Sequence, residues 1–501
     1  MIETSRRDIV VALAALGLWP GAACAQAGGV KLGKPKSFSW EALKQRAATL
    51  ATQPYREPVK VAAAAAIDYD AVGSISYKAD KTFAGGIRLF PLGRYAPMPV
   101  AINVVEGSGA RSVDFTPSLF QTSSGHHAAL GIAGFRAVST DGKTDWMAFI
   151  GASYFRTAGS QDQYGLSARG IAIDTGIDGK EEFPNFTEFW IQPNGPQAYI
   201  VYALLDGPSV TGAYRFDCRY SAAGVVQQVS STITLRKDVA RLGIAPATSM
   251  FWYGEGNRAA AVDWRPEIHD SDGLSMATGA GERIWRPLDN PADAKLDSFQ
   301  DTNPRGFGLV QRDRDFDHYQ DDGAFYDRRA NLWIEPKGDW GKGAVTLYAF
   351  PTASETVDNV AAFWVPAAPA KAGQAMNFDY TLTWSSRDPS IGIAAARAVS
   401  CWRGTAGRPG DTPTAGARKL VVDFIGAGLA GLDRSSGVTP QIDVGNGKVL
   451  ASAAYPVVGQ PNRWRVTADI APAKPGTLAD VRLFLKRGAA SLTETVLTQI
   501  T

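Results

Sequence analysis

The sequence of 501 residues predicts an all-β fold assembled from β-sandwiches. Most of its apolar segments are short and are interrupted by Gly, Asn, Asp and Pro, which is typical of sandwich strands and their turns. The 52 glycines and 29 prolines supply the turn residues that such a fold needs. A hydrophobic content of 45% is ample for a core, and a formal net charge of +2 gives no global reason to expect nucleic-acid binding.

The first 27 residues have the pattern of a twin-arginine signal peptide. The pair in Ser5-Arg6-Arg7-Asp8 precedes an apolar run over 9–18, and Ala25-Gln26-Ala27 is a small-residue cleavage site. The apolar run is too short to span a membrane. We expect cleavage after Ala27, export by the twin-arginine route to the periplasm, and no stable membrane insertion.

Cleavage at this point also removes Cys24 and leaves Cys218 and Cys401. An even pair permits a disulfide in an oxidising compartment, but the two cysteines are far apart in the sequence. We expect two unpaired, buried thiols.

One segment has a clear helical pattern. Ser39 is in position to cap it, Glu41 lies in its first turn and Pro54 ends it, while apolar residues recur at helical spacing. The recurring residues are Trp40, Leu43, Ala47 and Leu50. Beyond this helix the predicted strands are Ile87–Phe90, Val100–Val105, Trp146–Phe155, Ala198–Leu205, Ser231–Leu235 and Val345–Phe350.

The chain length predicts more than one domain. Tyr380–Trp384 reads as a closing strand, and the polar turn that follows it indicates a boundary. We therefore divide the mature chain into a large β-sandwich (28–384), a linker (385–396) and an immunoglobulin-like domain (397–501). Strands predicted in the small domain are Arg397–Trp402, Lys419–Phe424, Val449–Ala453, Arg463–Asp469 and Ala479–Lys486. This domain has no cluster of acids, histidines or aromatics, so we interpret it as a support or contact module.

The run Arg265–Leu274 is the strongest candidate for chemistry. Pro266 removes a backbone donor, and the Asp-Ser-Asp-Gly sequence favours a turn. Carboxylates on a loop flanked by Trp264 and Trp285 suit a carbohydrate site, in which acids react and aromatic faces hold sugar rings. The alternative is a surface turn with solvated acids.

Four other segments combine acidic and aromatic or basic residues, and each has a structural alternative. Phe183–Trp190 is either a sugar platform or sandwich core, and Phe251–Asn257 either leaves the Glu255 carboxylate free between two glycines or is core with a solvated turn. Gln311–Asp322 is either a solvated charged face or a salt-bridged lid. Glu355–Val360 places Asp358 at the mouth of a strand, where a structural turn is the alternative.

The sequence spacings do not indicate a metal site. Asp313, Asp315 and Asp317 resemble the start of a calcium loop, but His318 stands where that motif requires Gly. The adjacent His126 and His127 would point in opposite directions in a strand. We expect neither a metal nor another cofactor.

Several motifs, in order along the chain, resemble the periplasmic glucan biosynthesis family. They are Pro91–Tyr95, Phe186–Trp190, Tyr202–Ser209, Ser249–Glu255, Arg265–Leu274 and Asn303–Gly308. The resemblance covers essentially the whole mature chain, and the twin-arginine signal is similar to that of the D-type members. It implies a large sandwich similar to galactose mutarotase, followed by a small immunoglobulin-like domain.

The resemblance also implies an inverting glycoside hydrolase or transglycosylase acting on β-1,2-glucan. On the matching motifs Asp358 would be the general acid and Asp270 the general base, with Asp272 the alternative base because both would face one side of an extended stretch. The family implies that the proton travels through a substrate hydroxyl and ordered water. By chemical type and placement, we expect substrate contacts from Asp272, His269, Glu255, Trp252, Tyr326, Arg328 and Arg329.

Two rival functions remain open. A non-catalytic scaffold could hold glucan, and could contact other glucan synthesis proteins, using the same aromatic residues and the small domain. A polysaccharide lyase would use Tyr and His on a similar sandwich, but it needs a uronic acid and fewer carboxylates, so it ranks last.

Overall fold

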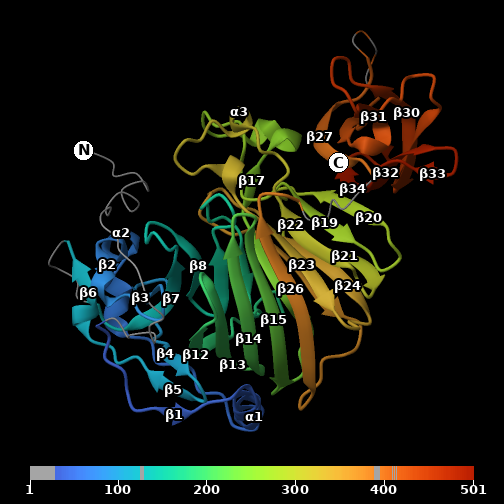
Figure 1. The fold of residues 1–501 in the computed structure, drawn as a ribbon. Helices are drawn as coiled ribbons and strands as arrows, with labels where there is room; N and C mark the ends of the chain where they lie inside the picture. The colour runs from blue at the N-terminus through green and yellow to red at the C-terminus, as the bar shows by residue number, and fades with distance from the viewer. Residues whose placement is uncertain are drawn as a thin grey trace.

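The computed structural model describes residues 29–123, 129–388, 395–408, 410, 412 and 414–500. The predicted signal peptide, Cys24 and the His126–His127 pair lie outside these residues. The described chain is nearly all β, as predicted, and its strands form two large sheets and several small ones (Figure 1). Cys218 and Cys401 are both buried and free, which confirms that expectation.

The larger sheet has sixteen strands within the described residues. In spatial order they are β1 (Lys36–Ser37), β5 (Gly109–Ser112), β4 (Ala101–Glu106), β12 (Asn185–Pro193), β13 (Ala198–Asp206), β14 (Val210–Ser221), β15 (Gly224–Leu235), β26 (Ala375–Ser385), β23 (Asn331–Lys337), β22 (Gly306–Val310), β19 (Gly273–Ala277), β20 (Arg283–Pro287), β34 (Thr495–Ile500), β32 (Ala479–Arg487) and β29 (Val438–Gly445), with β33 (Ala490–Ser491) beside β32.

The second sheet has ten strands in the described part of the chain. They are β21 (Lys295–Thr302), β24 (Lys342–Ala349), β25 (Val360–Pro366), β16 (Leu242–Ser249), β10 (Ser167–Arg169), β9 (Tyr154–Thr157), β8 (Asp145–Ile150), β7 (Ile132–Val138) and β3 (Ile87–Pro91), with β11 (Ile171–Ile173) beside β16. Smaller sheets pair β17 (Phe251–Tyr253) with β18 (Ile268–His269), β2 (Ile75–Tyr77) with β6 (Phe120–Thr122), and join β27 (Arg397–Thr405), β28 (Arg418–Ile425), β31 (Arg463–Pro472) and β30 (Gly447–Pro456).

The helices are few and short. They are α1 (Trp40–Ala51), α2 (Tyr69–Gly73), α3 (Phe316–Tyr319) and the 3₁₀ turns η2 (Ala62–Ala66), η3 (Ala79–Lys81), η4 (Pro117–Leu119), η5 (Glu255–Ala260), η6 (Tyr326–Arg328) and η7 (Ala427–Leu429). In the described residues, no helix combines the length and apolarity that crossing a membrane requires.

The main core lies between the two large sheets. Alternate residues of each strand point inward, so phenylalanines from both sheets meet. Phe149 of β8 lies 5.2 Å from Phe216 of β14, and Phe135 of β7 lies 5.2 Å from Phe189 of β12, between ring centroids. These contacts make the two sheets a sandwich.

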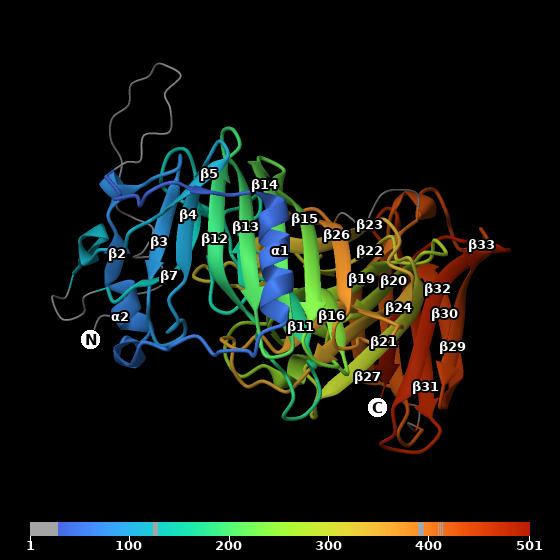
Figure 2. The same cartoon turned by 90° about the horizontal axis from the view of Figure 1, so that it is seen from below.

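The predicted helix forms and is capped by the predicted residue. The backbone N–H of Ala42 donates to the Ser39 hydroxyl over 3.1 Å, which satisfies one of the free donors at the helix start. Leu43 and Ala47 are buried. In Figure 2, α1 lies across the outer face of β13, β14 and β15. The helix therefore covers the back of the large sheet.

The central hairpin joins β14 and β15 through a tight turn that requires glycine. Ser221 pairs with Gly224, which has φ +121°. A Cβ atom at position 224 would lie 2.0 Å from the carbonyl oxygen of Trp384 on β26. Only glycine therefore lets β26 pair against β15 at this end.

One predicted strand is divided in two. Trp146–Phe155 was expected to be continuous, but the structure ends β8 at Ile150 and begins β9 at Tyr154. Gly151 and Ala152 both have positive φ values, +75° and +43°, which turn the chain back on itself. The apolar run thus supplies two antiparallel neighbours rather than one long strand.

The C-terminal strands form a second, smaller sandwich that is joined to the first. The four-stranded sheet packs against β29, β32 and β34 around a core that includes Phe424, Trp464 and Leu483. However, β34 also pairs in parallel with β20, with Ile284 opposite Thr495. The large sheet therefore continues into the small sandwich (Figure 1). The division at 385–396 remains our proposal for the domain boundary.

Candidate active site

Asp270 and Asn359, the residue after Asp358, are hydrogen-bonded to consecutive residues that follow β16. The backbone N–H of Asp270 donates to the carbonyl of Met250 over 2.8 Å. Asn359, which follows Asp358, accepts from the N–H of Phe251 and donates to its carbonyl, at 2.9 and 3.0 Å. Because Met250 and Phe251 are consecutive, the structure brings together two aspartates that are far apart in the sequence.

A second set of contacts links the same two segments. Arg329 forms an ion pair with Asp270, and its guanidinium lies 4.4 Å from the centroid of the Tyr326 ring. The Tyr326 hydroxyl donates to Glu355, which also accepts from Arg265 over 3.0 Å. Since Glu355 lies on the loop that carries Asp358, this network holds that loop against the segment that carries Arg329.

The electrostatic environment raises the pKa of both aspartates. Burial is the main reason why the pKa of Asp270 rises to about 6. The positive charge of Arg329 lowers this pKa, and the negative charge of Asp358 raises it further. Asp358 is exposed to solvent as a residue, yet the protein around its carboxyl desolvates it and raises its pKa against the charges of Arg156, Arg169 and Arg329. Each aspartate is thus easier to protonate than a free carboxyl.

Two of these arginines were not predicted from the sequence. Arg156 on β9 alternates with the core residue Phe155, so it lies on the face of the ten-stranded sheet that points away from the core. Arg169 on β10 lies 4.8 Å from the Tyr154 ring and binds Glu181 over 2.9 Å. The alternation in Tyr154–Thr157 could have indicated an outward Arg156, but nothing in the sequence indicated that it lies near Asp358.

Asp272 belongs to a different environment from Asp270. One of its oxygens accepts from the backbone N–H groups of Arg312 and Asp313, both at 3.0 Å. It lines a cavity of about 50 Å³ between β18 and β27. Burial raises its pKa to about 6, although His269 opposes the rise. The expectation that Asp270 and Asp272 face the same side is therefore not met, and Asp270 is the aspartate coupled to Asp358.

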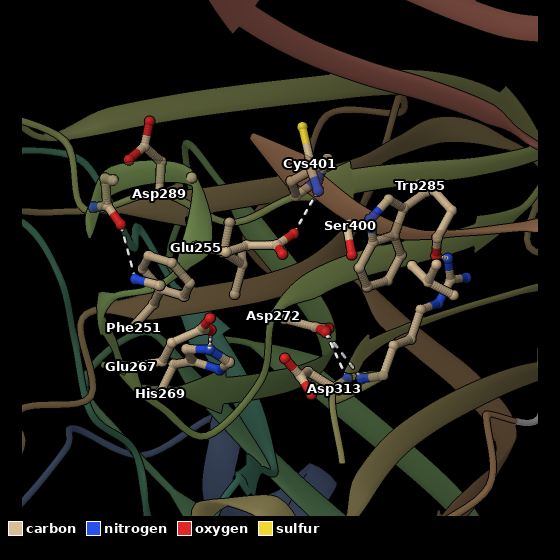
Figure 3. A pocket seen from close by; sticks show the side chains of 18 of the residues that line it. Phe251, Glu255, Glu267, His269, Asp272, Trp285, Asp289, Asp313, Ser400 and Cys401 are labelled. Atoms are coloured by element: carbon tan, nitrogen blue, oxygen red, sulfur yellow. Dashed lines mark hydrogen bonds and ion pairs between the residues drawn. The ribbon is translucent and has the colours of Figure 1, made fainter. Parts of the chain in front are cut away.

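Glu255 and His269 also lie on this cavity, which we call the interdomain cavity (Figure 3). Glu255 accepts from the backbone N–H of Cys401, and burial raises its pKa to about 8. Neither a free carboxylate nor a solvated turn, the two alternatives for Glu255, describes this contact, because β27 of the small sandwich covers the carboxylate. His269 is buried between Glu267 and Gln311, at 2.9 and 3.0 Å.

The remaining predicted contacts divide into two groups. Tyr326 and Arg329 lie beside Asp270, as described above. Trp252 is half-buried against the ring of Tyr253, with centroids 5.4 Å apart. Arg328 is half exposed and contacts Asp327 and the Phe325 ring. The structure thus brings Tyr326 and Arg329 to Asp270, while Trp252 and Arg328 have other neighbours.

Two segments proved more structural than catalytic. Phe186 and Phe189 are buried in the core, which confirms the core interpretation for Phe183–Trp190. In Gln311–Asp322, Arg312 is buried and binds Asp388 and Glu494, whereas Arg314 donates to the carbonyls of Asp327 and Arg329. These arginines point inward, so the segment is not simply a solvated face.

Comparisons with known proteins agree with these motifs. The model of the family described as "Periplasmic glucan biosynthesis protein, MdoG" matches residues 38–500. The chain is 43% identical to glucans biosynthesis protein D 2 of Ralstonia nicotianae, over 97% of this chain and 95% of the relative. It is 42% identical to glucans biosynthesis protein D of Stenotrophomonas maltophilia, over 99% and 97%.

Among solved structures, the similar ones are remote. A polysaccharide lyase covers 73% of this chain and 44% of its own length, with a TM-score of 0.24 and 10% identity. A galactose mutarotase related enzyme from Lactobacillus acidophilus covers 52% and 97%, with a TM-score of 0.23 and 9% identity. The family assignment rests on the sequence relatives alone: the chain belongs to the periplasmic glucan biosynthesis protein family.

Proposed function

We propose that the protein acts on β-1,2-glucan as an inverting glycoside hydrolase or transglycosylase, with Asp358 as the general acid and Asp270 as the general base. The observation that carries the proposal is the proximity of the two aspartates. Asp270 is hydrogen-bonded to Met250 and Asn359, the residue after Asp358, to the adjacent Phe251, and the charge of Asp358 raises the pKa of Asp270. Inversion requires two carboxyl groups on opposite faces of one sugar ring, one to protonate the leaving oxygen and one to activate the attacking water.

The environments of the two carboxyls support this division of roles. Asp358 is exposed, so a glycan can reach it, and its raised pKa favours the protonated form that an acid needs. Asp270 has a pKa of about 6 and is mainly ionised at neutral pH, as a base must be. Because Asp270 is only 4% exposed, we infer that an ordered water or a substrate hydroxyl carries the proton to it.

The same site supports two outcomes of the reaction. If water reaches the acceptor position, the glycosyl group is hydrolysed, and if a sugar hydroxyl occupies it, the group is transferred. In both cases Arg156 and Arg329 flank the reacting bond and donate hydrogen bonds to sugar hydroxyls. The place of action is the periplasm, which the twin-arginine pattern of residues 1–27 supports.

The alternative function is a scaffold that holds glucan without cleaving it. The contact between Glu255 and Cys401 favours a rigid joint between the two sandwiches, which suits a scaffold as well as an enzyme. Other glucan synthesis proteins would be its partners.

The test is product analysis with a linear β-1,2-glucan. The unmodified protein should shorten or rearrange the chains, with inverted anomeric configuration by NMR, and Asp358→Asn and Asp270→Asn should each abolish this while retaining glucan binding by calorimetry. Asp238→Asn, an exposed aspartate paired with Lys371, is the matched control and should remain active. Binding without any change in chain length in the unmodified protein would favour the scaffold, and full activity in Asp358→Asn would exclude its role as acid.

A further inference from the structure

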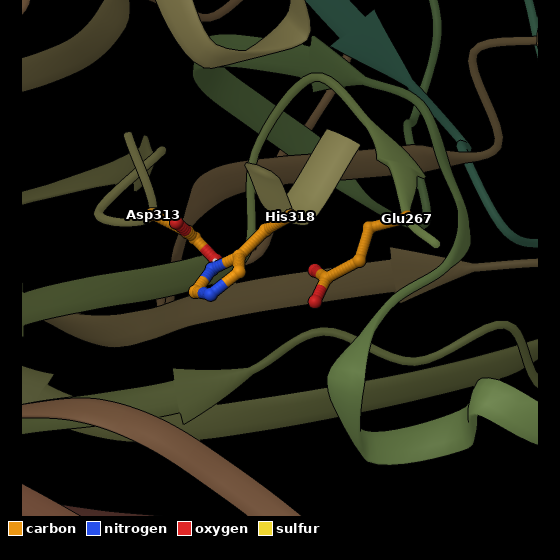
Figure 4. Close-up of side chains that lie close together, drawn as sticks. All are labelled: Glu267, Asp313 and His318. Atoms are coloured by element: carbon orange, nitrogen blue, oxygen red, sulfur yellow. The ribbon is translucent and has the colours of Figure 1, made fainter. Parts of the chain in front are cut away.

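Three side chains with metal-ligating atoms converge at the rim of the interdomain cavity. Glu267 immediately precedes β18, Asp313 follows β22, and His318 lies on α3. One ligand atom from each residue lies within 4.8 Å of the others (Figure 4). No sequence spacing pointed to this group, because its members come from two segments separated by the five strands β18 to β22.

We propose that Glu267, Asp313 and His318 bind a divalent first-row transition metal ion, with Zn²⁺ as the expected occupant. One imidazole and two carboxylates are a donor set that suits Zn²⁺, whereas Ca²⁺ and Mg²⁺ prefer oxygen ligands alone. Three protein ligands leave a fourth tetrahedral position for water. Asp313 and His318 already lie 2.6 Å apart, so an ion would replace the hydrogen bond between them.

Neighbouring residues hold these ligands in place. His269 binds Glu267 at 2.9 Å, and Gln311 binds the other ring nitrogen of His269 at 3.0 Å. The backbone N–H of Asp313 donates to Asp272. Such outer contacts are what fix the orientation of ligands in metal sites.

A separate observation is a buried carboxylate oxygen in the same cavity that lacks a hydrogen-bond donor in the described part of the chain. The Oδ1 atom of Asp272, which lines the same cavity, is fully buried and has no hydrogen-bond partner within the described residues. Buried acceptors without a donor are rare in proteins, because the lost solvation is not replaced. A water on the fourth metal position would supply that donor.

The carboxyl groups around the cavity also favour a bound cation. Its wall carries the carboxyl groups of Glu255, Glu267, Asp272, Asp289 and Asp313, of which Glu255, with a pKa of about 8, is mainly protonated at neutral pH. Of the two arginines of the wall, Arg403 pairs with Asp289, whereas Arg312 binds Asp388 and Glu494, which are not among these acids. A cation at the rim would offset the remaining negative charge. It has a route of entry because half of the His318 side chain is exposed.

An ion at this position would brace the segment that presents Arg329 to Asp270. Asp313 and His318 begin this segment, and Tyr326 and Arg329 end it. The site is independent of the glucan reaction, however, because within the described residues none of its three ligands contacts Asp270 or Asp358. The proposal can therefore fail while the proposed function holds, and the reverse is also true.

The test is Zn²⁺ binding to the chelator-treated mature protein without a histidine tag. Calorimetry should show one Zn²⁺ per chain, and the melting temperature should rise with Zn²⁺ concentration. Co²⁺ in place of Zn²⁺ should give visible d–d absorption from a site of low symmetry. His318→Ala, Asp313→Asn and Glu267→Gln should each remove the binding and the stabilisation, with folding checked by circular dichroism.

Two controls separate this site from surface binding. Asp317→Asn, an exposed aspartate next to His318 on α3, carries the same charge change as Asp313→Asn and should bind Zn²⁺ normally. The double variant His126→Ala/His127→Ala removes the other histidine pair and should also bind normally. No binding by the unmodified protein, or binding that survives both His318→Ala and Asp313→Asn, would overturn the proposal.

Discussion

At the scale of single residues, the aspartate pair depends on the arginines around it. Asp270 is held by Arg329, and Asp358 faces the charges of Arg156, Arg169 and Arg329. Positive charge stabilises both carboxylates in their ionised forms, while burial works against it. The balance leaves Asp270 with a pKa of about 6, which lies within the range in which an enzyme assay can follow it.

The first prediction concerns the acid side of the pH profile. The rate of glucan cleavage should fall as the pH drops below about 6, because Asp270 must lose its proton to act as the base. Replacing Arg329 with Met removes a charge that lowers this pKa, so the acid limb of kcat/KM should move to higher pH. Arg329→Lys keeps the charge and should leave the limb closer to its original position. An unchanged limb in Arg329→Met would contradict the assignment of that limb to Asp270.

At the scale of secondary-structure elements, β9 and β10 form one wall of the candidate site. Alternation along β9 directs Phe155 into the core and Arg156 away from it, and Tyr154 pairs with Arg169 across the two strands. Arg156 has no hydrogen-bond or ion-pair partner in the described part of the chain, although its charge reaches both aspartates. A donor of this kind beside two carboxyls is suited to sugar hydroxyls.

The second prediction is that Arg156→Ala weakens glucan binding without unfolding the protein. Loss of a charged hydrogen bond to the substrate corresponds to about a tenfold or greater rise in KM. Arg156→Lys should recover part of this loss, because a point charge replaces the planar guanidinium. The readouts are KM and the melting temperature together. If KM stays unchanged in Arg156→Ala, the residue does not contact the glucan.

Local pattern was sufficient for elements whose determinants are close in the sequence. The α1 helix forms because Ser39 caps it and because Leu43 and Ala47 share a face. The same reasoning joined β8 and β9, since periodicity does not reveal that Ala152 adopts a positive φ. Local reasoning also left open whether the Glu255 carboxylate is free or part of a solvated turn, and it did not predict the bond to Cys401, which comes from another sandwich.

The candidate site shows the same limit. The motifs predicted Asp270 and Asp358, and the coupling between them appears in the raised pKa of Asp270. Arg156 and the Glu267–Asp313–His318 group were missed, because they depend on strands and loops that meet only in three dimensions. The roles of the residues named from the family motifs therefore stay predictions, and the residues placed by tertiary packing were not predicted.

At the scale of the whole molecule, a buried ionic network joins the two sandwiches. Arg312 follows β22 of the large sheet and binds Glu494, which precedes β34, and Asp388 at the predicted linker. All three side chains are almost fully buried. The Arg312 guanidinium also lies 3.7 Å from the centroid of the Trp285 ring on β20. The two sandwiches should therefore unfold together.

The third prediction is that Arg312→Met destabilises the protein by about 3–5 kcal/mol, because it leaves buried carboxylates without their cation. Denaturant unfolding should remain a single transition with a lower midpoint. Adding Glu494→Gln to this variant should recover part of the loss, since it removes one of the unpaired charges. Two separate transitions in the unmodified protein would contradict the coupling, and a loss below about 1 kcal/mol would show that the network is weak.

The parallel pairing of β20 with β34 has a consequence for biosynthesis. Ile284 leaves the ribosome long before Thr495, so the hydrogen-bonding edge of β20 stays unpaired through the translation of everything between them. Contacts between residues this distant form slowly, and an open strand edge invites pairing with other chains. During that interval the nascent chain avoids aggregation only if chaperones bind it or if translation and folding are fast. Substitutions that delay the pairing of β34 with β20 would therefore reduce the yield of folded protein before they reduce its activity.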